Sequence, residues 1–222
     1  MLERIVADAV ADSATALSSE AYALLRYNTE YLLERLQAPA PPVVAALTPA
    51  ITLTRSGEFT LVLTGSGFVN GSQVLWNGSD RPTTLHSSTE LTTGITGRDV
   101  ASPITAAITV RNPDGSVSAP LSFSVVTALP HAVRPILECV TRHPDRSYTA
   151  WFGYKNLNDV AVYLPIGHRN RFTPGPKDRG QPTVFLPGRK TKVFSVHFPG
   201  HDLDWTLNDR TSTASRDSER CR

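Results

Sequence analysis

The sequence predicts a mainly β protein in which two β-sandwiches in tandem follow an N-terminal amphipathic α-helix. Three observations lead to this fold class. Apolar residues recur at helical spacing in the first 37 positions. From Pro49 onward they alternate every second residue, in short runs separated by turn residues. The 222 residues include 17 Pro and 14 Gly, yet 40% are hydrophobic, so the chain is rich in turns and can still bury a core.

The N-terminal segment, residues 1–37, is expected to be an assembly or docking helix. Its apolar positions recur at threes and fours with charged residues mostly between them. Ser18 and Ser19 favour a break in the helix, because serine is a better cap than interior residue. Two interpretations stay open: the apolar stripe packs on its own β domain, or it binds another copy or a different protein. The residues expected to mediate assembly are Val10, Leu17, Leu24, Leu25 and Leu32.

Residues 38–47 are expected to form an extended, semi-rigid linker. Pro39, Pro41 and Pro42 resist a tight turn back toward the helix. This stiffness favours a partner other than the neighbouring sandwich for the helix. A homo-oligomer or a protein partner is therefore the preferred expectation.

Residues 48–127 contain six short runs with strand periodicity, separated by turn residues such as Asn112-Pro113-Asp114-Gly115. The stretch Gly65-Ser66-Gly67-Phe68, the later Asn77-Gly78 turn and the Ala107 to Pro113 strand and turn occur in order. In these segments the chain resembles the IPT/TIG domain. The resemblance implies an immunoglobulin-like β-sandwich over about 80 residues.

After a short linker at 128–134, residues 135–222 are expected to form the second sandwich. Pro187-Gly188 and Pro199-Gly200 are type II turn pairs between strand-like runs. The sequence segments around Trp151, around Gln181 and at Asp204-Trp205-Thr206-Leu207 are similar to a module of large bacterial surface and secreted proteins. That resemblance implies an extracellular setting and no assigned activity.

The two cysteines, Cys139 and Cys221, bracket the second unit. A disulfide between them would close a loop of roughly 80 residues and contribute at most about 4 to 5 kcal/mol in the chain-entropy model. Its reduction is expected to destabilise this unit and to leave residues 48–127 nearly unchanged. Two separate buried thiols are the alternative.

An extracellular or cell-surface location is expected, since paired cysteines suit an oxidising compartment. Acidic residues near the N-terminus, among them Glu3, Asp8 and Asp12, interrupt the apolar run that a signal peptide needs, so the export route is open. No membrane span is expected either. The longest uncharged stretch, residues 38–54, is rich in proline.

Two sets of polar residues were candidates for binding. A candidate ligand loop for sugar or polyanion consists of Asp178, Arg179, Gln181 and Arg189. The polar residues His197, His201, Asp202, Asp204 and Asp209 lack metal-ligand spacing, so no metal or other cofactor is expected.

Composition also limits the function. With 22 basic and 20 acidic residues the net charge is +2, which disfavours nucleic-acid binding. No nucleophile-base pair, acid-base pair or phosphate loop occurs at usable spacing, so the chain is not expected to be an enzyme. The favoured function is a structural or adhesive surface protein. The alternative is a carbohydrate-binding accessory module, for which exposed aromatic rings would be diagnostic.

Overall fold

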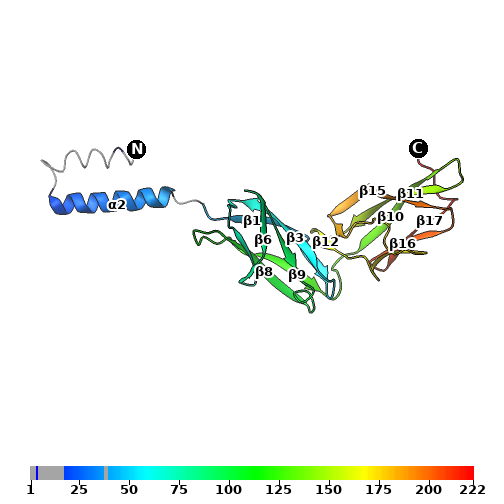
Figure 1. Ribbon diagram of the computed structural model, residues 1–222, viewed down its shortest axis with the longest axis horizontal. Helices are drawn as coiled ribbons and strands as arrows, with labels where there is room; N and C mark the ends of the chain where they lie inside the picture. The colour runs from blue at the N-terminus through cyan, green and yellow to red at the C-terminus, as the bar shows by residue number, and fades with distance from the viewer. Residues whose placement is uncertain (1–3, 5–17, 38–39) are drawn as a thin grey trace. The chain divides into compact units, whose positions relative to one another are not determined.

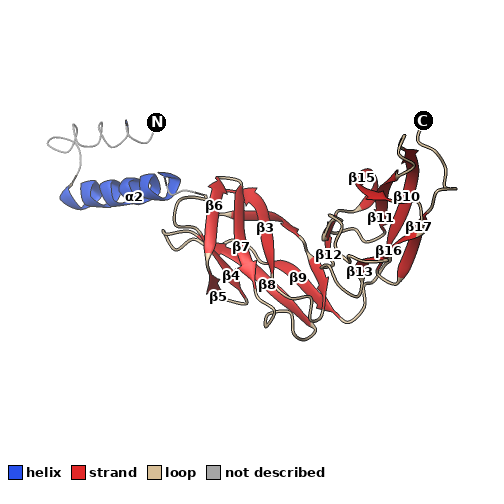
Figure 2. Ribbon diagram, turned by 45° about the vertical axis from the view of Figure 1, so that its right-hand side comes forward, coloured by secondary structure: helices blue, strands red, loops and turns tan. Residues whose placement is uncertain are grey.

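The computed structural model describes residue 4, residues 18–37 and residues 40–222, and it divides the chain into two units, Met1–Ala40 and Pro41–Arg222. The expected fold class is confirmed: one described helix precedes two immunoglobulin-like β-sandwiches (Figures 1 and 2). The helix is α2 (Ser19–Gln37), and the strands are β1 (Val43–Thr48), β2 (Ile51–Leu53), β3 (Phe59–Ser66), β4 (Gln73–Trp76), β5 (Ser79–Arg81), β6 (Thr83–Ser87), β7 (Glu90–Ile95), β8 (Ile104–Arg111), β9 (Leu121–Val126), β10 (Val133–Arg142), β11 (Tyr148–Asn156), β12 (Val162–Tyr163), β13 (Asn170–Thr173), β14 (Val184–Phe185), β15 (Gly188–Phe198), β16 (Leu203–Leu207) and β17 (Arg210–Ala214).

Helix α2 begins where the serine pair predicts a break. The Ser18 hydroxyl accepts a hydrogen bond from the Ala21 amide at 3.3 Å, which caps the first turn. Farther along, Arg26 donates to Glu30 at 2.8 Å, one helical turn away. Two of the expected assembly residues, Val10 and Leu17, lie outside the described residues.

The first sandwich packs the sheet β1-β3-β7-β6 against the strands β2-β9-β8-β4-β5. Alternating side chains of both sheets point inward, as the period of two predicts. Phe68, which follows the Gly-x-Gly turn, is buried in this core, which also contains Trp76 and Phe123. Trp76 is therefore a core residue and offers no exposed platform for a sugar ring.

The expected linker at 38–47 is wrong in its second half, because β1 begins at Val43 and pairs with β3. The pairing depends on Gly65. A Cβ at this position would lie 1.8 Å from the Val43 carbonyl oxygen, so no larger residue fits while the two strands stay in register. An extended segment next to prolines can be either a linker or an edge strand, and the local sequence pattern does not distinguish the two.

Asp99 closes the loop before β8. It accepts hydrogen bonds from the Thr96 amide at 2.9 Å and the Thr96 hydroxyl at 2.6 Å, and it forms an ion pair with Arg81 at 2.5 Å. Burial alone would raise the pKa of Asp99, but these hydrogen bonds and the Arg81 charge together hold it below its ordinary value.

The second sandwich is built from the sheets β10-β11-β15 and β13-β16-β17. Trp205, which is fully buried, lies at the centre of its aromatic core and packs against Phe152, Phe172 and Phe194. The buried amide of Asn170 accepts the indole N–H of Trp205 at 3.0 Å. Trp205, like Trp76, is a core residue.

The two sandwiches share one sheet. Strand β2 of the first pairs in parallel with β12 of the second, so a seven-stranded sheet, β14-β12-β2-β9-β8-β4-β5, runs through both. The buried Thr52 hydroxyl donates to the Tyr163 carbonyl at 3.1 Å. Ile51 and Leu53 of β2 pack in the core of the second sandwich.

Strand β10 begins at Val133, inside the segment 128–134 expected to be a linker. The β2–β12 pairing joins residues more than 100 positions apart, and a local sequence pattern cannot predict such a contact. Residues 41–222 are consequently one unit with two cores.

Candidate functional site

A polar groove of about 740 Å³ opens at one end of the second sandwich. We call it the arginine groove. Three segments distant in sequence form it: the β10–β11 turn, the β15–β16 turn and the chain that follows β17. It is lined by Arg142, Arg146, Tyr148, Pro199, Gly200, His201, Asp202, Ser215, Arg216 and Asp217.

The β10–β11 turn holds Arg146 at the rim. His143 and Ser147 close the turn through a backbone hydrogen bond of 2.9 Å. The Asp145 carboxylate accepts from the Ser147 hydroxyl at 2.6 Å and from its amide at 3.0 Å, and these bonds lower the pKa of Asp145. Arg146 adopts a φ of 67°, which turns the chain at this point.

The β15–β16 turn forms the second wall. Gly200 has a φ of 99° and lies directly against the Tyr148 ring, because a Cβ there would come within 2.7 Å of a ring carbon and 3.6 Å of the Arg216 Cβ. The Tyr148 side chain is only 8% exposed and supports the groove from below. The predicted Pro199-Gly200 turn thus brings His201 and Asp202 to the groove.

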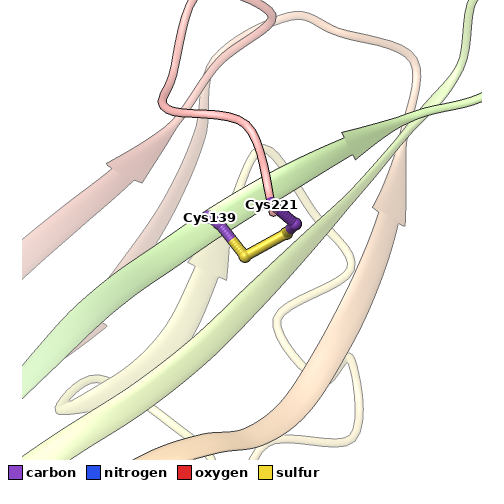
Figure 3. The surroundings of a disulfide bond; sticks show 2 residues. All are labelled: Cys139 and Cys221. Atoms are coloured by element: carbon purple, nitrogen blue, oxygen red, sulfur yellow. A yellow bond between two sulfur atoms is a disulfide. The ribbon is translucent and has the colours of Figure 1, made fainter.

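The chain after β17 forms the third wall, and the Cys139–Cys221 disulfide fastens it to β10 (Figure 3). The two Cα atoms lie 4.9 Å apart. Around the disulfide, the Val140 amide donates to the backbone carbonyl of Glu219 at 2.8 Å, and the Cys221 amide donates to the backbone carbonyl of Val140 at 3.2 Å. The Arg220 guanidinium lies 5.2 Å from the centre of the Tyr148 ring, a cation–π contact.

The charged groups of the arginine groove are largely unpaired. Within the described chain, Arg142 and Arg146 form no ion pair, and Arg216 approaches its neighbour Asp217 at 3.7 Å with both side chains mostly exposed. Elsewhere Arg111 donates to both carboxylate oxygens of Asp80 at 2.9 Å. The groove therefore presents guanidinium groups whose hydrogen bonds are free for a ligand.

The candidate ligand loop expected from sequence is not gathered into one site. Arg179 donates to carbonyls in its own loop, and Asp178 accepts the Gly180 amide at 2.9 Å. Gln181 is buried and bonds within the same loop. Arg189 lies on β15, where it pairs with Glu138 at 2.6 Å. These polar groups stabilise local structure, since each has a partner inside the chain.

The residues considered as metal ligands also separate. His197 stacks on His143 with ring centres 5.9 Å apart, and Asp209 pairs with Arg169 at 2.7 Å. Asp204 accepts the Thr213 hydroxyl at 2.5 Å. Over residues 18–37 and 40–222, no three His, Cys, Asp or Glu side chains gather as a metal site would require.

The expected assembly residues that are described lie on α2 and are exposed. Leu24 is 68% exposed, and Leu25 and Leu32 are also accessible to solvent. Tyr27 adds a further exposed ring, at 70%. Among the described helices, none has the length and apolar character that a membrane crossing demands.

Sequence reasoning missed the arginine groove, although one signal for it was present. The predicted disulfide brings the residues before Cys221 beside those after Cys139. Arg216 precedes the second cysteine, and Arg142 and Arg146 follow the first. Combining the bridge with these three positions would have predicted the groove.

Comparison with known proteins gives no family assignment. No protein-family model matches the chain, and no curated protein sequence does. Among solved structures, the chain is similar to gamma-CGTase from alkalophilic Bacillus clarkii at 13% identity and a TM-score of 0.32, over 83% of this chain and 26% of that one. It is also similar to the I9–I11 tandem of titin at 10% identity and a TM-score of 0.27, over 78% of this chain and 64% of that one.

A chimeric titin Z1Z2 carrying a peptide from decorin is similar at 12% identity and a TM-score of 0.31, over 81% of this chain and 96% of that one. The chain spans about a quarter of the length of the gamma-CGTase and just under two thirds of the I9–I11 tandem. The fold of this chain is accordingly assigned from its own sheets and hydrophobic cores and not from these similarities.

Proposed function

We propose that this chain is a non-catalytic structural or adhesive protein of a bacterial cell surface or extracellular assembly. In this proposal helix α2 mediates self-assembly or docking, the first sandwich acts as a spacer, and the second acts as a binding module.

The shared seven-stranded sheet is the observation that carries the proposal. A spacer must hold its binding module at a constant position, and two sandwiches joined by a flexible linker cannot do so. Here the β2–β12 pairing and the packing of Ile51 and Leu53 in the second core join them. Tyr163 adds a ring contact with Phe59, 4.5 Å between centres, and its hydroxyl donates to the Glu58 carbonyl at 3.2 Å.

The exposed apolar face of α2 supports the assembly role. An isolated helix gains little stability from propensity alone, so large apolar side chains in solvent favour burial against a partner. Leu24 and Leu25 are adjacent on this face and accessible. A second copy of the chain is the partner that this proposal names.

The location rests on the disulfide and on the two sequence resemblances. Disulfides persist in oxidising compartments, which favours an extracellular or surface protein. The Gly65 to Phe68 turn and the buried Phe68 support membership of the first sandwich in the IPT/TIG group. The similarity of residues 135–222 to a module of bacterial surface proteins supports a bacterial origin.

The alternative, a carbohydrate-binding accessory module, is favoured by one specific observation. The arginine groove is polar, and its lining includes Arg142 and Arg146, which form no ion pair within the described chain. Trp76 and Trp205 are buried, and the half-buried Trp151 lies outside the groove lining, so recognition at the groove would depend on hydrogen bonds and charge rather than ring stacking.

The assembly role is tested by measuring the mass of the full chain in solution, by sedimentation, against a variant with both Leu24→Asp and Leu25→Asp. Two charges on the apolar face would have to be buried unpaired, which costs several kcal/mol, so we expect an oligomer for the natural chain and a monomer for the variant. Asn28→Asp, which adds a charge at an exposed polar position of the same helix, is the matched control and should leave the mass unchanged. A natural chain that is already monomeric at tens of micromolar would contradict self-assembly.

A further inference from the structure

The arginine groove contains both kinds of partner that an acidic sugar requires. Guanidinium groups bind carboxylates through two parallel hydrogen bonds, and the groove provides them from two of its three segments, Arg142 and Arg146 from the β10–β11 turn and Arg216 from the chain after β17. Carboxylates accept hydrogen bonds from hydroxyl groups, and Asp202 and Asp217 provide these acceptors in the same groove.

The lining also discriminates between classes of ligand. A neutral sugar usually stacks on an exposed ring, but Tyr148 is almost fully covered by Gly200 and by the Arg220 guanidinium. The side chains of an acidic peptide carry carboxylates but no hydrogen-bond donor, so only its backbone N–H groups could pair with Asp202 and Asp217. A ligand that carries carboxylates and hydroxyls on the same sugar ring can pair with the arginines and the aspartates of the groove together.

From this arrangement we infer that the arginine groove binds a uronic-acid oligosaccharide, whose carboxylates pair with the three arginines and whose hydroxyls donate to the two aspartates. The inference rests on the proposed function in one respect, namely that the second sandwich is the binding module. It names the ligand class of that module.

The disulfide is part of the site. Arg216 lies on the chain after β17, and that chain is held to β10 by the bridge and by the hydrogen bonds between Val140 and residues 219 and 221. Breaking the bridge loosens the third wall, because only non-covalent contacts then hold it, namely the backbone bonds at Val140 and the Arg220–Tyr148 contact. Binding should consequently require the oxidised protein.

The test is a calorimetric titration of the full chain with tetragalacturonate at low and at high salt. We expect measurable binding that weakens as salt rises. Arg142→Ala and Arg146→Ala should each weaken it about tenfold, the expected loss of one charge-assisted pair at an exposed site. Arg134→Ala, at the opposite end of β10 and also exposed, is the matched control and should bind like the natural chain.

Two further ligands decide the class. A neutral malto-oligosaccharide and a poly-glutamate peptide of similar length are titrated under the same conditions. Weaker binding of both supports a uronate ligand. Binding of the peptide equal to or tighter than that of tetragalacturonate would overturn the ligand class, and absence of tetragalacturonate binding at millimolar concentration would overturn the site.

The role of the disulfide is tested with the double variant Cys139→Ser and Cys221→Ser, whose fold is checked by circular dichroism at the titration temperature. We expect a folded protein that binds at least tenfold more weakly. If the double variant is unfolded at that temperature, Arg216→Ala in the oxidised chain takes its place, and unchanged binding by this variant would overturn the third wall as part of the site. Failure of binding leaves the sedimentation result untouched, so the two proposals fail separately.

Discussion

Removal of the Cys139–Cys221 bridge tests whether the two sandwiches are energetically one unit. The bridge joins residues separated by 82 positions, and closing a loop of this length removes about 4.5 kcal/mol of chain entropy from the unfolded state at ~25 °C. The disulfide lies next to the second core, since Val140, which follows Cys139 in the chain, is buried in that core. We therefore expect the double variant Cys139→Ser and Cys221→Ser to lose about 4 kcal/mol of unfolding free energy.

The structure revises where this loss is felt. Considered by sequence alone, the first sandwich lies outside the closed loop and should be unaffected. In the structure, Ile51 and Leu53 of β2 belong to the second core, and β2 also pairs with β9 of the first sandwich. Unfolding of the second sandwich would expose these two side chains, so the loss should extend to the first.

The assay combines urea denaturation with hydrogen exchange read by mass spectrometry. Denaturation gives the free energy of unfolding, and exchange of the amides in β3 and β11 reports on the first and second sandwich separately. We expect protection to fall in both. A fall confined to β11 would refute the coupling through β2, and a loss below about 1 kcal/mol would refute the chain-entropy argument. Reductant added to the double variant should change nothing, which controls for effects of the reagent itself.

Three further substitutions test individual polar side chains. Thr52→Val keeps the side-chain shape and removes the hydroxyl that bonds both the Tyr163 carbonyl and the Ser56 hydroxyl, so a loss of about 1 to 2 kcal/mol in urea denaturation is expected, and an unchanged midpoint would contradict a contribution from this hydroxyl. Asn170→Ala removes the acceptor of the buried Trp205 indole N–H and the N–H groups that donate to the Leu164 and Pro182 carbonyls, so a loss of about 3 kcal/mol and a shifted tryptophan emission are expected, whereas unaltered emission would argue against the Trp205 contact. Asp99 has a lowered pKa in the folded state, so its contribution to stability is complete above the unfolded value near ~4 and is lost as pH falls through the folded value. Asp99→Asn should thus reduce stability at neutral pH and flatten the decline in stability as the pH falls below about 4, and an acid limb as steep as that of the natural chain would contradict this assignment.

The sequence alone determined the local and periodic features of the molecule. The period of two and the turn residues identified the mainly β class, because a half-buried strand requires alternation whatever it packs against. The start of α2 at Ser19 followed from the capping preference of serine. The disulfide partners were predictable because the second unit contains both of the cysteines in the chain.

Tertiary structure alone decided how the segments combine. Strand β1 within the expected linker exists because Gly65 lets another strand approach, and the parallel pairing of β2 with β12 joins distant residues whose own patterns are ordinary. The arginine groove likewise brings together Arg142, Arg146 and Arg216, which lie up to 74 positions apart in the sequence. Local propensity acts over a few residues, while a binding site depends on which surfaces the folded chain brings together.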